Sequence, residues 1–396
     1  MTGARSTGAR STGAPGARST TSCFAIIAGG GTGGHVQPAL AVAEALVARG
    51  HERASVHFVG SERGMEATLV PEAGFEVTLL PGRGIQRRLT AENFGAVYGI
   101  GSACWQALGI LRRRRPSVVV TVGGYAGFPP AFAALLERVP VVVVSYDAVP
   151  GAANRLVGRF AAANAVAFPG SGLPNARVTG PPVRASVLAV DRSPVGRKIA
   201  CTELGIDPDR LVVLATGGSL GARTVNRAVV SFSQAWRDHA DLCVYHVAGD
   251  RNLDEVRTAA QAAGLFGHDA RLDYRLAGFE RRMPLLLAAC DLVVGRAGAS
   301  TVAELAALGV PSVLVPLPGS PSDHQTKNAR ALADAGASVM VADSECSGAR
   351  LGEVIEPLLA EPAMRASMSE AASRLGHRDA ADQIALLAES VVRRAA

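Results

Sequence analysis

From residue 24 onward, short runs of β-branched and other apolar residues alternate with alanine-rich stretches that are long enough for helices. The runs are apolar throughout rather than alternating with polar residues, as in FAIIA, SVVVTV and PVVVVS. Uninterrupted apolar runs are typical of parallel strands that helices cover on both faces. The alternation therefore predicts an α/β chain built on doubly wound parallel sheets.

The alternation breaks once, over residues 183–199, where Pro, Ser and Arg are frequent, and then resumes with LVVLATGGSLGA. Of the 396 residues 48% are hydrophobic, which is enough for two cores. We expect an N-terminal domain over 23–182, a linker over 183–199, a C-terminal domain over 200–370, and a helix within 371–396 that packs back on the N-terminal domain. Residues 1–22 repeat GARST and TGA and have no apolar core. They indicate a disordered tail, or a start codon that is assigned too far upstream, rather than a secretory signal.

Composition narrows the function classes. The net charge of +6 suits anionic ligands or an anionic membrane surface. Aromatic residues make up only 5% and no basic stretch is interleaved with them, so we expect no nucleic-acid partner. The six cysteines are scattered without a C-x-x-C pair, which predicts buried thiols in a reducing compartment. No segment approaches the roughly 18 apolar residues of a membrane span.

Two glycine-rich turns, GGGTGG over 29–34 and GGSLGA over 217–222, each follow an apolar strand and precede a helix. A helix N-terminus presents unpaired N–H groups, and glycine lets a phosphate approach them. Tight turns need glycine in any case, but two turns at equivalent places favour phosphate binding. An NAD-dependent oxidoreductase is disfavoured, because the second strand ends in Gly60 and Ser61 without a carboxylate for the ribose.

A third turn lies in VVGRAGASTVAEL over 293–305, where we expect a helix to begin near Ser300 or Thr301. Thr301 and Glu304 fit a T-x-x-E capping box, in which Glu304 would only stabilise its helix. Alternatively, Glu304 stands near the carboxyl end of a parallel strand, where ligands bind in open α/β sheets. A carboxylate there can accept two hydrogen bonds from vicinal ribose hydroxyls. The sequence leaves both interpretations open.

Six segments occur in a characteristic order: GGGTGGHVQPALAVA, GGYAGFP, PGAANR, GGSLGARTVN, GRAGASTVAE and DHQTKNA. Together they resemble the bacterial undecaprenyldiphospho-muramoylpentapeptide β-N-acetylglucosaminyltransferases, from residue 23 to the C-terminus. The resemblance implies the GT-B fold, with two Rossmann-like domains facing across a cleft. It also implies inverting transfer of N-acetylglucosamine from UDP-N-acetylglucosamine to the 4-hydroxyl of undecaprenyl-diphosphate-linked N-acetylmuramoyl-pentapeptide, the last cytoplasmic step of peptidoglycan precursor synthesis.

The resemblance also implies which residues contact each substrate. Those expected at the acceptor are Gly30, Gly31, Thr32, Gly33, Gly34, Tyr125 and Asn154. Those expected at the donor are Thr32, Gly33, Gly34, Arg184, Ser219, Asn226, Arg296, Ala299, Ser300, Thr301, Glu304 and Gln325. Neither a metal nor another cofactor is expected. The sequence DPD over 207–209 has the spacing of a metal-binding D-x-D, but it precedes its strand and so lies at the wrong end of the sheet.

His35 is the first candidate for the general base that removes the proton of the acceptor hydroxyl. A helix N-terminus lowers the pKa of an imidazole, and the neutral form is the one that accepts a proton. Donation of a hydrogen bond, or capping of the loop, is the alternative role. Asp147 is the second candidate, and it stands where the family commonly has asparagine. Two further departures, Ser145 for glutamate and Pro181 for asparagine, keep open a non-catalytic paralogue or another GT-B glycolipid glycosyltransferase.

Residues 82–115 combine apolar side chains with arginines, which predicts peripheral attachment to an anionic membrane surface. The apolar candidates are Ile85, Leu89, Phe94, Trp105, Leu108 and Ile110, and the basic ones are Arg87, Arg88 and 112–115. A helix packed on its sheet with a solvated basic end is the alternative. The resemblance places the protein on the cytoplasmic face of the cell membrane, in reach of a cell-wall synthesis complex.

Overall fold

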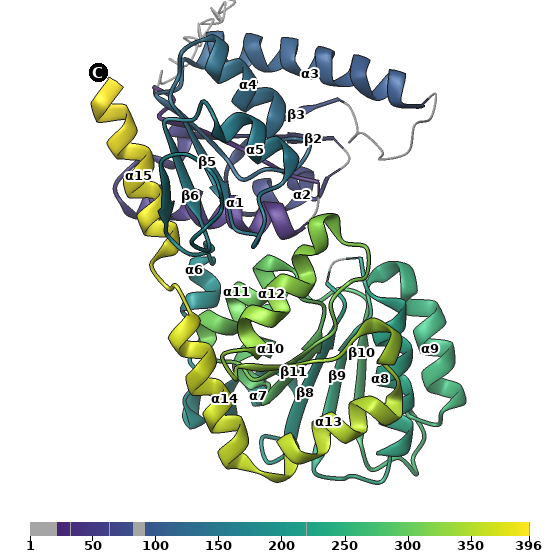
Figure 1. Cartoon of the computed structure of the whole chain (residues 1–396). Coiled ribbons are helices and arrows are strands. Elements are labelled where there is room, and N and C mark those ends of the chain that lie inside the picture. The colour runs from purple at the N-terminus through teal and green to yellow at the C-terminus, as the bar shows by residue number, and fades with distance from the viewer. Residues whose placement is uncertain (1–21, 32, 63, 82–91, 219, 396) are drawn as a thin grey trace, which may run out of the picture.

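The computed structural model describes residues 22–31, 33–62, 64–81, 92–218 and 220–395, and for 92–98 the backbone only. These residues form two lobes, each a parallel sheet covered by helices on both faces (Figure 1). The predicted α/β class with two doubly wound sheets is confirmed.

The N-terminal lobe holds a seven-stranded sheet in the order β3-β2-β1-β4-β5-β6-β7, and every neighbouring pair is parallel. The strands are β1 (Ala25–Ala28), β2 (Val56–Ser61), β3 (Glu76–Leu80), β4 (Val118–Thr121), β5 (Val141–Ser145), β6 (Ala163–Val166) and β7 (Ala176–Val178). The helices are α1 (Gly33–Ala48), α2 (Glu66–Glu72), α3 (Glu92–Arg114), α4 (Phe128–Leu136) and α5 (Ala152–Gly158). Helices α1 and α2 share one core with the sheet, whereas α3, α4 and α5 cover the opposite face. Strand order reverses between β1 and β4, so the switch point lies beside the first glycine turn.

The C-terminal lobe holds a six-stranded parallel sheet in the order β10-β9-β8-β11-β12-β13. Its strands are β8 (Leu211–Thr216), β9 (Leu242–Val247), β10 (Asp273–Ala277), β11 (Leu292–Gly295), β12 (Ser312–Leu314) and β13 (Ser338–Met340). Its helices are α7 (Pro194–Leu204), α8 (Arg223–Ala235), α9 (Leu253–Ala262), α10 (Met283–Ala289), α11 (Ala299–Leu308), α12 (His324–Ala333), α13 (Gly348–Ala360) and α14 (Pro362–Leu375). Short 3-10 turns are η1 (Arg53–Ser55), η2 (Asp250–Asn252), η3 (Pro321–Asp323) and η4 (Asp343–Glu345).

Two segments connect the lobes. Residues 183–199 contain the short helix α6 (Ala185–Leu188) and the start of α7, so this stretch is partly helical. At the other end of the chain, α15 (Ala380–Ala395) leaves the C-terminal lobe and packs against α1 (Figure 1). Its buried face, including Ile384 and Leu387, joins the core of the N-terminal lobe. The last helix therefore fastens one lobe to the other.

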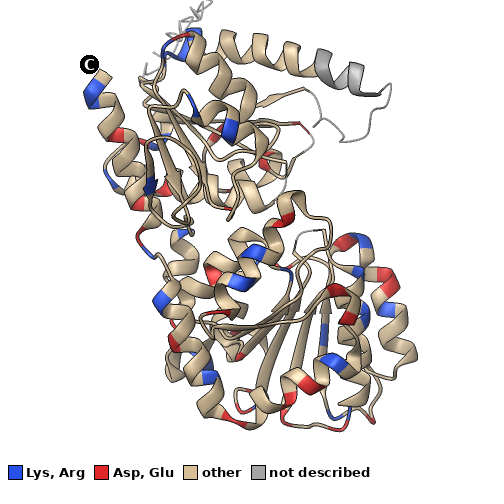
Figure 2. Cartoon of the chain, in the orientation of Figure 1, with Lys and Arg blue, Asp and Glu red and all other residues tan. Residues whose placement is uncertain are grey.

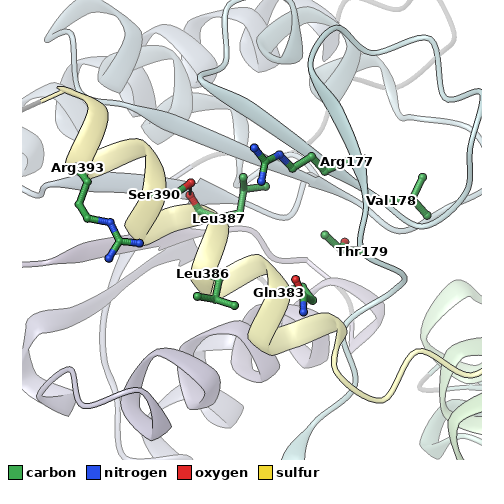
Figure 3. Close-up of a pocket in the computed structure, with 8 residues that line it drawn as sticks. All are labelled: Arg177, Val178, Thr179, Gln383, Leu386, Leu387, Ser390 and Arg393. Atoms are coloured by element: carbon green, nitrogen blue, oxygen red, sulfur yellow. Dashed lines mark hydrogen bonds between the residues drawn. The ribbon is translucent and has the colours of Figure 1, made fainter.

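A cavity of about 320 Å³ lies between edge strand β7 and α15 (Figure 3). Arg177 lines it on the strand side, and Gln383, Ser390 and Arg393 line it on the helix side. None of the residues predicted for either substrate lines this cavity. The glycine turns predicted to bind the substrates lie instead at the carboxyl ends of β1 and β8.

Candidate active site

The two lobes meet through the first turns of α1 and α11. Ser300 Oγ in α11 donates a hydrogen bond of 3.1 Å to the carbonyl oxygen of Gly34 in α1. Each of these helices follows the carboxyl end of a parallel strand, β1 and β11 respectively. The positive ends of two helix dipoles therefore point toward one region between the lobes.

The first glycine turn rests on a carboxylate that we did not predict. Glu66, the first residue of α2 and only 1% exposed, accepts a hydrogen bond of 2.9 Å at Oε2 from the backbone N–H of Gly31. Its Oε1 accepts one of 2.6 Å from the N–H of Ser61, at the end of β2. A Cβ atom at Gly30 would overlap this carboxylate. Glycine at position 30 therefore makes room for a side chain of the protein itself.

His35 lies in the first turn of α1 beside the segment GGYAGFP. Gly124 has φ +75°, and a Cβ atom there would be 3.1 Å from the imidazole Cδ2 of His35. The ring of Tyr146 meets the imidazole edge to face, with centroids 6.0 Å apart. Burial lowers the pKa of His35, although the negative charges of Asp147 and Glu66 oppose that effect. A low pKa keeps the imidazole neutral, as a general base requires.

Asp147 follows β5 and is bound to the opposite lobe. Its Oδ1 lies 2.8 Å from Nδ1 of His324, the first residue of α12. The next backbone N–H, of Ala148, donates to Oδ1 of Asn328 one turn further along α12. Asp147 is thus engaged in an inter-lobe hydrogen bond, and its role as the base stays a prediction.

The other expected acceptor residues surround the same turn. Asn154 is buried and its Nδ2 donates to the carbonyl oxygen of Val144, while its amide lies against Gly123. The hydroxyl of Tyr125 is buried and has no hydrogen-bond partner among the described residues. Thr32 lies outside the described residues.

Helix α11 begins at Ala299, with Gly298 as its N-cap, and no side chain caps it. The predicted capping box is therefore wrong, because Thr301 is the third residue of the helix rather than its cap. Burial raises the pKa of Glu304 to about 7, and the charge of Arg184 opposes this shift. Glu304 therefore takes no part in capping α11, and its contact with a ribose stays a prediction.

Arg184 precedes α6 and forms hydrogen bonds with side chains of α1. Its Nη2 lies 2.7 Å from Oε1 of Glu44, and its Nη1 donates to Oε1 of Gln37. This ion pair anchors the first connection between the lobes. Its predicted contact with the nucleotide stays a prediction.

The second glycine turn is held by two asparagines. Asn252 Nδ2 donates to the carbonyl oxygen of Leu220, and a Cβ atom at Gly221 would overlap the carbonyl oxygen of Ala248. Asn226 is buried, and it donates to that same carbonyl while its Oδ1 contacts Nε2 of His246. We therefore attribute to Asn226 a role in shaping the turn. Ser219 lies outside the described residues.

Two other donor candidates also bind inside their own lobe. Arg296 is buried, donates to the carbonyl oxygens of Val315 and Pro316, and contacts Asp343. Gln325 uses its Oε1 to accept a hydrogen bond of 2.9 Å from the N–H of Leu317. Arg296 is thereby fixed as support for the loop after β12.

Among the described residues, no cluster of three or more His, Cys, Asp or Glu side chains could hold a metal ion. The DPD segment over 207–209 lies between α7 and β8, at the amino end of the sheet as predicted. Asp207 accepts a hydrogen bond there from the N–H of Asp209, which is ordinary loop geometry.

The class of protein follows from comparison with known families. The glycosyltransferase family 28 N-terminal domain matches residues 25–166, and the family 28 C-terminal domain matches residues 212–384. The chain is a glycosyltransferase with the GT-B fold. Within that class it belongs to the family of UDP-N-acetylglucosamine–N-acetylmuramyl-(pentapeptide) pyrophosphoryl-undecaprenol N-acetylglucosamine transferases.

The relatives are similar over nearly their whole length. The transferase of Desulforudis audaxviator is 38% identical over 91% of this chain and 96% of its own. That of Alkalilimnicola ehrlichii is 41% identical over the same shares of the two chains. The crystal structure of Acinetobacter baumannii MurG covers 93% of this chain and 99% of its own, with a TM-score of 0.68 and 27% identity. These matches confirm the family that the sequence motifs indicated.

Proposed function

We propose that this protein transfers N-acetylglucosamine from UDP-N-acetylglucosamine to the 4-hydroxyl of undecaprenyl-diphosphate-linked N-acetylmuramoyl-pentapeptide, with inversion. The names of the relatives support both substrates. The observation that carries the assignment of the site is the contact between Ser300 and Gly34. It brings the first turn of the expected donor helix, α11, against the turn that holds His35.

In this arrangement the acceptor hydroxyl attacks the anomeric carbon from the face opposite UDP. The imidazole of His35 takes the hydroxyl proton as the new C–O bond forms, and UDP leaves with the electron pair of the broken bond. Negative charge grows on the leaving diphosphate. The N-terminal N–H groups of α8 and α11 can stabilise that charge, because no side chain caps either helix.

We assign the acceptor to the N-terminal lobe and the donor to the C-terminal lobe. Gly33, Gly34 and the buried hydroxyl of Tyr125 support an acceptor site at the first turn of α1. Glu304 supports a ribose site on α11, because it is a carboxylate inside the helix that does not cap it. Ser145, Asp147 and Pro181 lie outside both α1 and α11.

The test is transfer by the full chain, with a panel of UDP-sugars against the lipid-linked muramoyl acceptor and a glycolipid acceptor. We expect N-acetylglucosamine transfer to the muramoyl acceptor alone. His35→Ala should lower kcat by about 10²- to 10⁴-fold and leave UDP binding unchanged. His268→Ala, at an exposed histidine of the C-terminal lobe, is the control. No transfer by the wild type would indicate a non-catalytic paralogue, and normal turnover by His35→Ala would remove His35 as the base.

We further propose that the N-terminal lobe attaches to an anionic membrane surface. Within the described residues, every helix is too short or too polar to cross a bilayer. Helices α3, α4 and α5 and the residue two positions after α5 nevertheless carry exposed apolar side chains. We call this set the outer apolar face: Trp105 of α3, Phe132 and Leu136 of α4, Leu156 of α5, and Phe160 just after α5. Exposed arginines at 138, 155 and 159 lie among them in the sequence and could meet anionic headgroups.

The structure revises the membrane prediction for α3. Trp105 is 76% exposed, as expected, but Ile110 is buried against the sheet and cannot face lipid. Arg112 and Arg114 are paired with Glu137 and Glu76, respectively. Figure 2 shows no charge along the described part of α3 before its basic C-terminal end. Ile85, Arg87, Arg88, Leu89 and the side chain of Phe94 lie outside the described residues.

A further inference from the structure

The first glycine turn is built around a buried side chain. We propose that Glu66 is a positioning residue for the transfer reaction: its carboxylate fixes the turn that carries His35 and leaves the first turn of α1 to face the substrate. The inference rests on the proposed function, because it assigns Glu66 to the acceptor side of the same site.

Three glycines from separate segments surround the carboxylate. Gly30 follows β1, Gly60 lies at the end of β2, and Gly64 lies just before α2. A Cβ atom at any of the three would overlap Glu66. A glycine in a phosphate-binding turn normally makes room for a ligand. Here the space is already filled, so these three glycines are explained by Glu66.

The hydrogen bonds of the carboxylate join two neighbouring strands. Oε1 and Oε2 lie 3.2 and 2.9 Å from the N–H of Gly31, and Oε1 also accepts from the N–H of Ser61. β1 and β2 are paired in the sheet, so Glu66 ties together the loops at their carboxyl ends. Glu66 is the first residue of α2, where the helix dipole favours a negative charge. A buried carboxylate is stable in this place because backbone donors and a helix end surround it.

This arrangement limits where an anionic ligand can bind. The N–H of Gly31 is occupied by Glu66, and a second anion there would be repelled by its charge. We expect a diphosphate to bind instead at the N-terminus of α1, at Gly33 and Gly34, where the helix dipole favours negative charge. We therefore expect the residues after Gly31, rather than Gly31 itself, to contact the acceptor diphosphate.

Glu66 also acts on His35 through its charge. The groups that influence the protonation of His35 are the carboxylates of Glu66 and Asp147, the imidazole of His324 and the burial of the ring. The two carboxylates raise the pKa of His35, whereas burial and His324 lower it. Loss of the charge at Glu66 should therefore make His35 a weaker base that stays neutral at lower pH.

Two substitutions distinguish the effect of the charge of Glu66 from the effect of its side-chain length. Glu66→Gln keeps the size of the side chain and removes the charge, whereas Glu66→Asp keeps the charge and shortens the side chain. Glu52→Gln, at an exposed glutamate of the same lobe, is the control. Each full-length variant is assayed for kcat across pH, for KM toward the lipid-linked acceptor, and for the Kd of UDP.

We expect Glu66→Gln to lower kcat about tenfold or more and to move the acidic limb of the kcat profile to lower pH. Glu66→Asp should raise the acceptor KM several-fold with its acidic limb in place. The Kd of UDP should stay unchanged in both, because the donor site lies in the other lobe. If Glu66→Gln does not fold, the acceptor KM of Glu66→Asp decides the matter.

Unchanged kcat, acceptor KM and acidic limb in folded variants would overturn the proposal. A rise in the Kd of UDP equal to the rise in acceptor KM would do the same, because it would indicate a general loss of structure. An inactive wild type would contradict the proposed function instead. The two failures are therefore distinguishable.

Discussion

We expect UDP binding to change the protonation state of the Glu304 carboxyl. Burial raises its pKa to about 7, so in the free protein near neutral pH a large fraction of this carboxyl is protonated. Vicinal ribose hydroxyls would favour the ionised form by donating hydrogen bonds to it. We expect UDP binding at pH 7 to release protons, and UDP affinity to fall as the pH falls through 7. Calorimetric titration in buffers of different ionisation enthalpy measures both effects.

The same shift has a consequence for stability. A carboxyl whose pKa is raised on folding contributes stability that is complete below its ordinary pKa and is lost as the pH rises through 7. At pH 8 the buried charge therefore costs up to about 3 kcal/mol. Glu304→Gln should raise the melting temperature at pH 8 more than at pH 5, while UDP affinity falls and loses its pH dependence. Glu356→Gln, at an exposed glutamate of α13, is the control. Unaltered UDP affinity in Glu304→Gln would contradict the ribose contact.

The role of a single residue could be predicted where its partners lie close to it in the sequence. His35 could be placed from its own turn, because a glycine-rich strand-to-helix connection is a local pattern. Glu66 could not, because its partner Gly31 lies 35 positions away and α2 shows no motif of its own. The contact between His324 and Asp147 could not be predicted for the same reason, because the two residues lie 177 positions apart in the sequence.

At the scale of elements, apolar periodicity predicted strands well and helix starts poorly. The apolar runs FAIIA, SVVVTV and PVVVVS contain strands β1, β4 and β5, respectively. Strand β7 was missed because its three residues are all exposed and carry no apolar pattern. The capping box failed because Ala299 and Ser300 already belong to α11.

Helix α12 and the segment after β5 hold the two lobes together, and we expect the hydrogen bond between Asp147 and His324 to contribute most to this contact. Asp147 and His324 have side chains only 28% and 21% exposed. Asp147→Asn keeps the shape and removes the charge of the carboxylate. We expect it to weaken closure of the lobes by about 1 kcal/mol or less, seen as a larger radius of gyration in small-angle X-ray scattering of the free protein.

A matched control exists in the same interface. Glu72 pairs with Arg281 across the lobes, but these side chains are 44% and 73% exposed. Exposed ion pairs contribute little, so Glu72→Gln should leave the radius of gyration unchanged. His324→Gln should open the lobes as much as Asp147→Asn does, and the double variant no further. Additive effects would show that the two residues act independently.

For the whole molecule, the outer apolar face predicts how the protein meets a membrane. Leu156→Ser combined with Phe160→Ser should weaken binding to vesicles of anionic phospholipid several-fold, because both side chains are exposed beside arginines. Binding of the wild type should also weaken at high salt, since headgroup contacts are screened. Vesicle sedimentation measures both effects, and transfer to a detergent-solubilised acceptor should be unaffected.

Position, rather than apolar character alone, should decide membrane binding. Phe266 is 47% exposed and lies in the C-terminal lobe, away from α3, α4 and α5. Phe266→Ser should therefore bind vesicles as the wild type does. If it weakened binding as much as the paired change at Leu156 and Phe160, the membrane would contact both lobes. If the protein bound uncharged vesicles as tightly as anionic ones, the arginines would not contribute to membrane attachment.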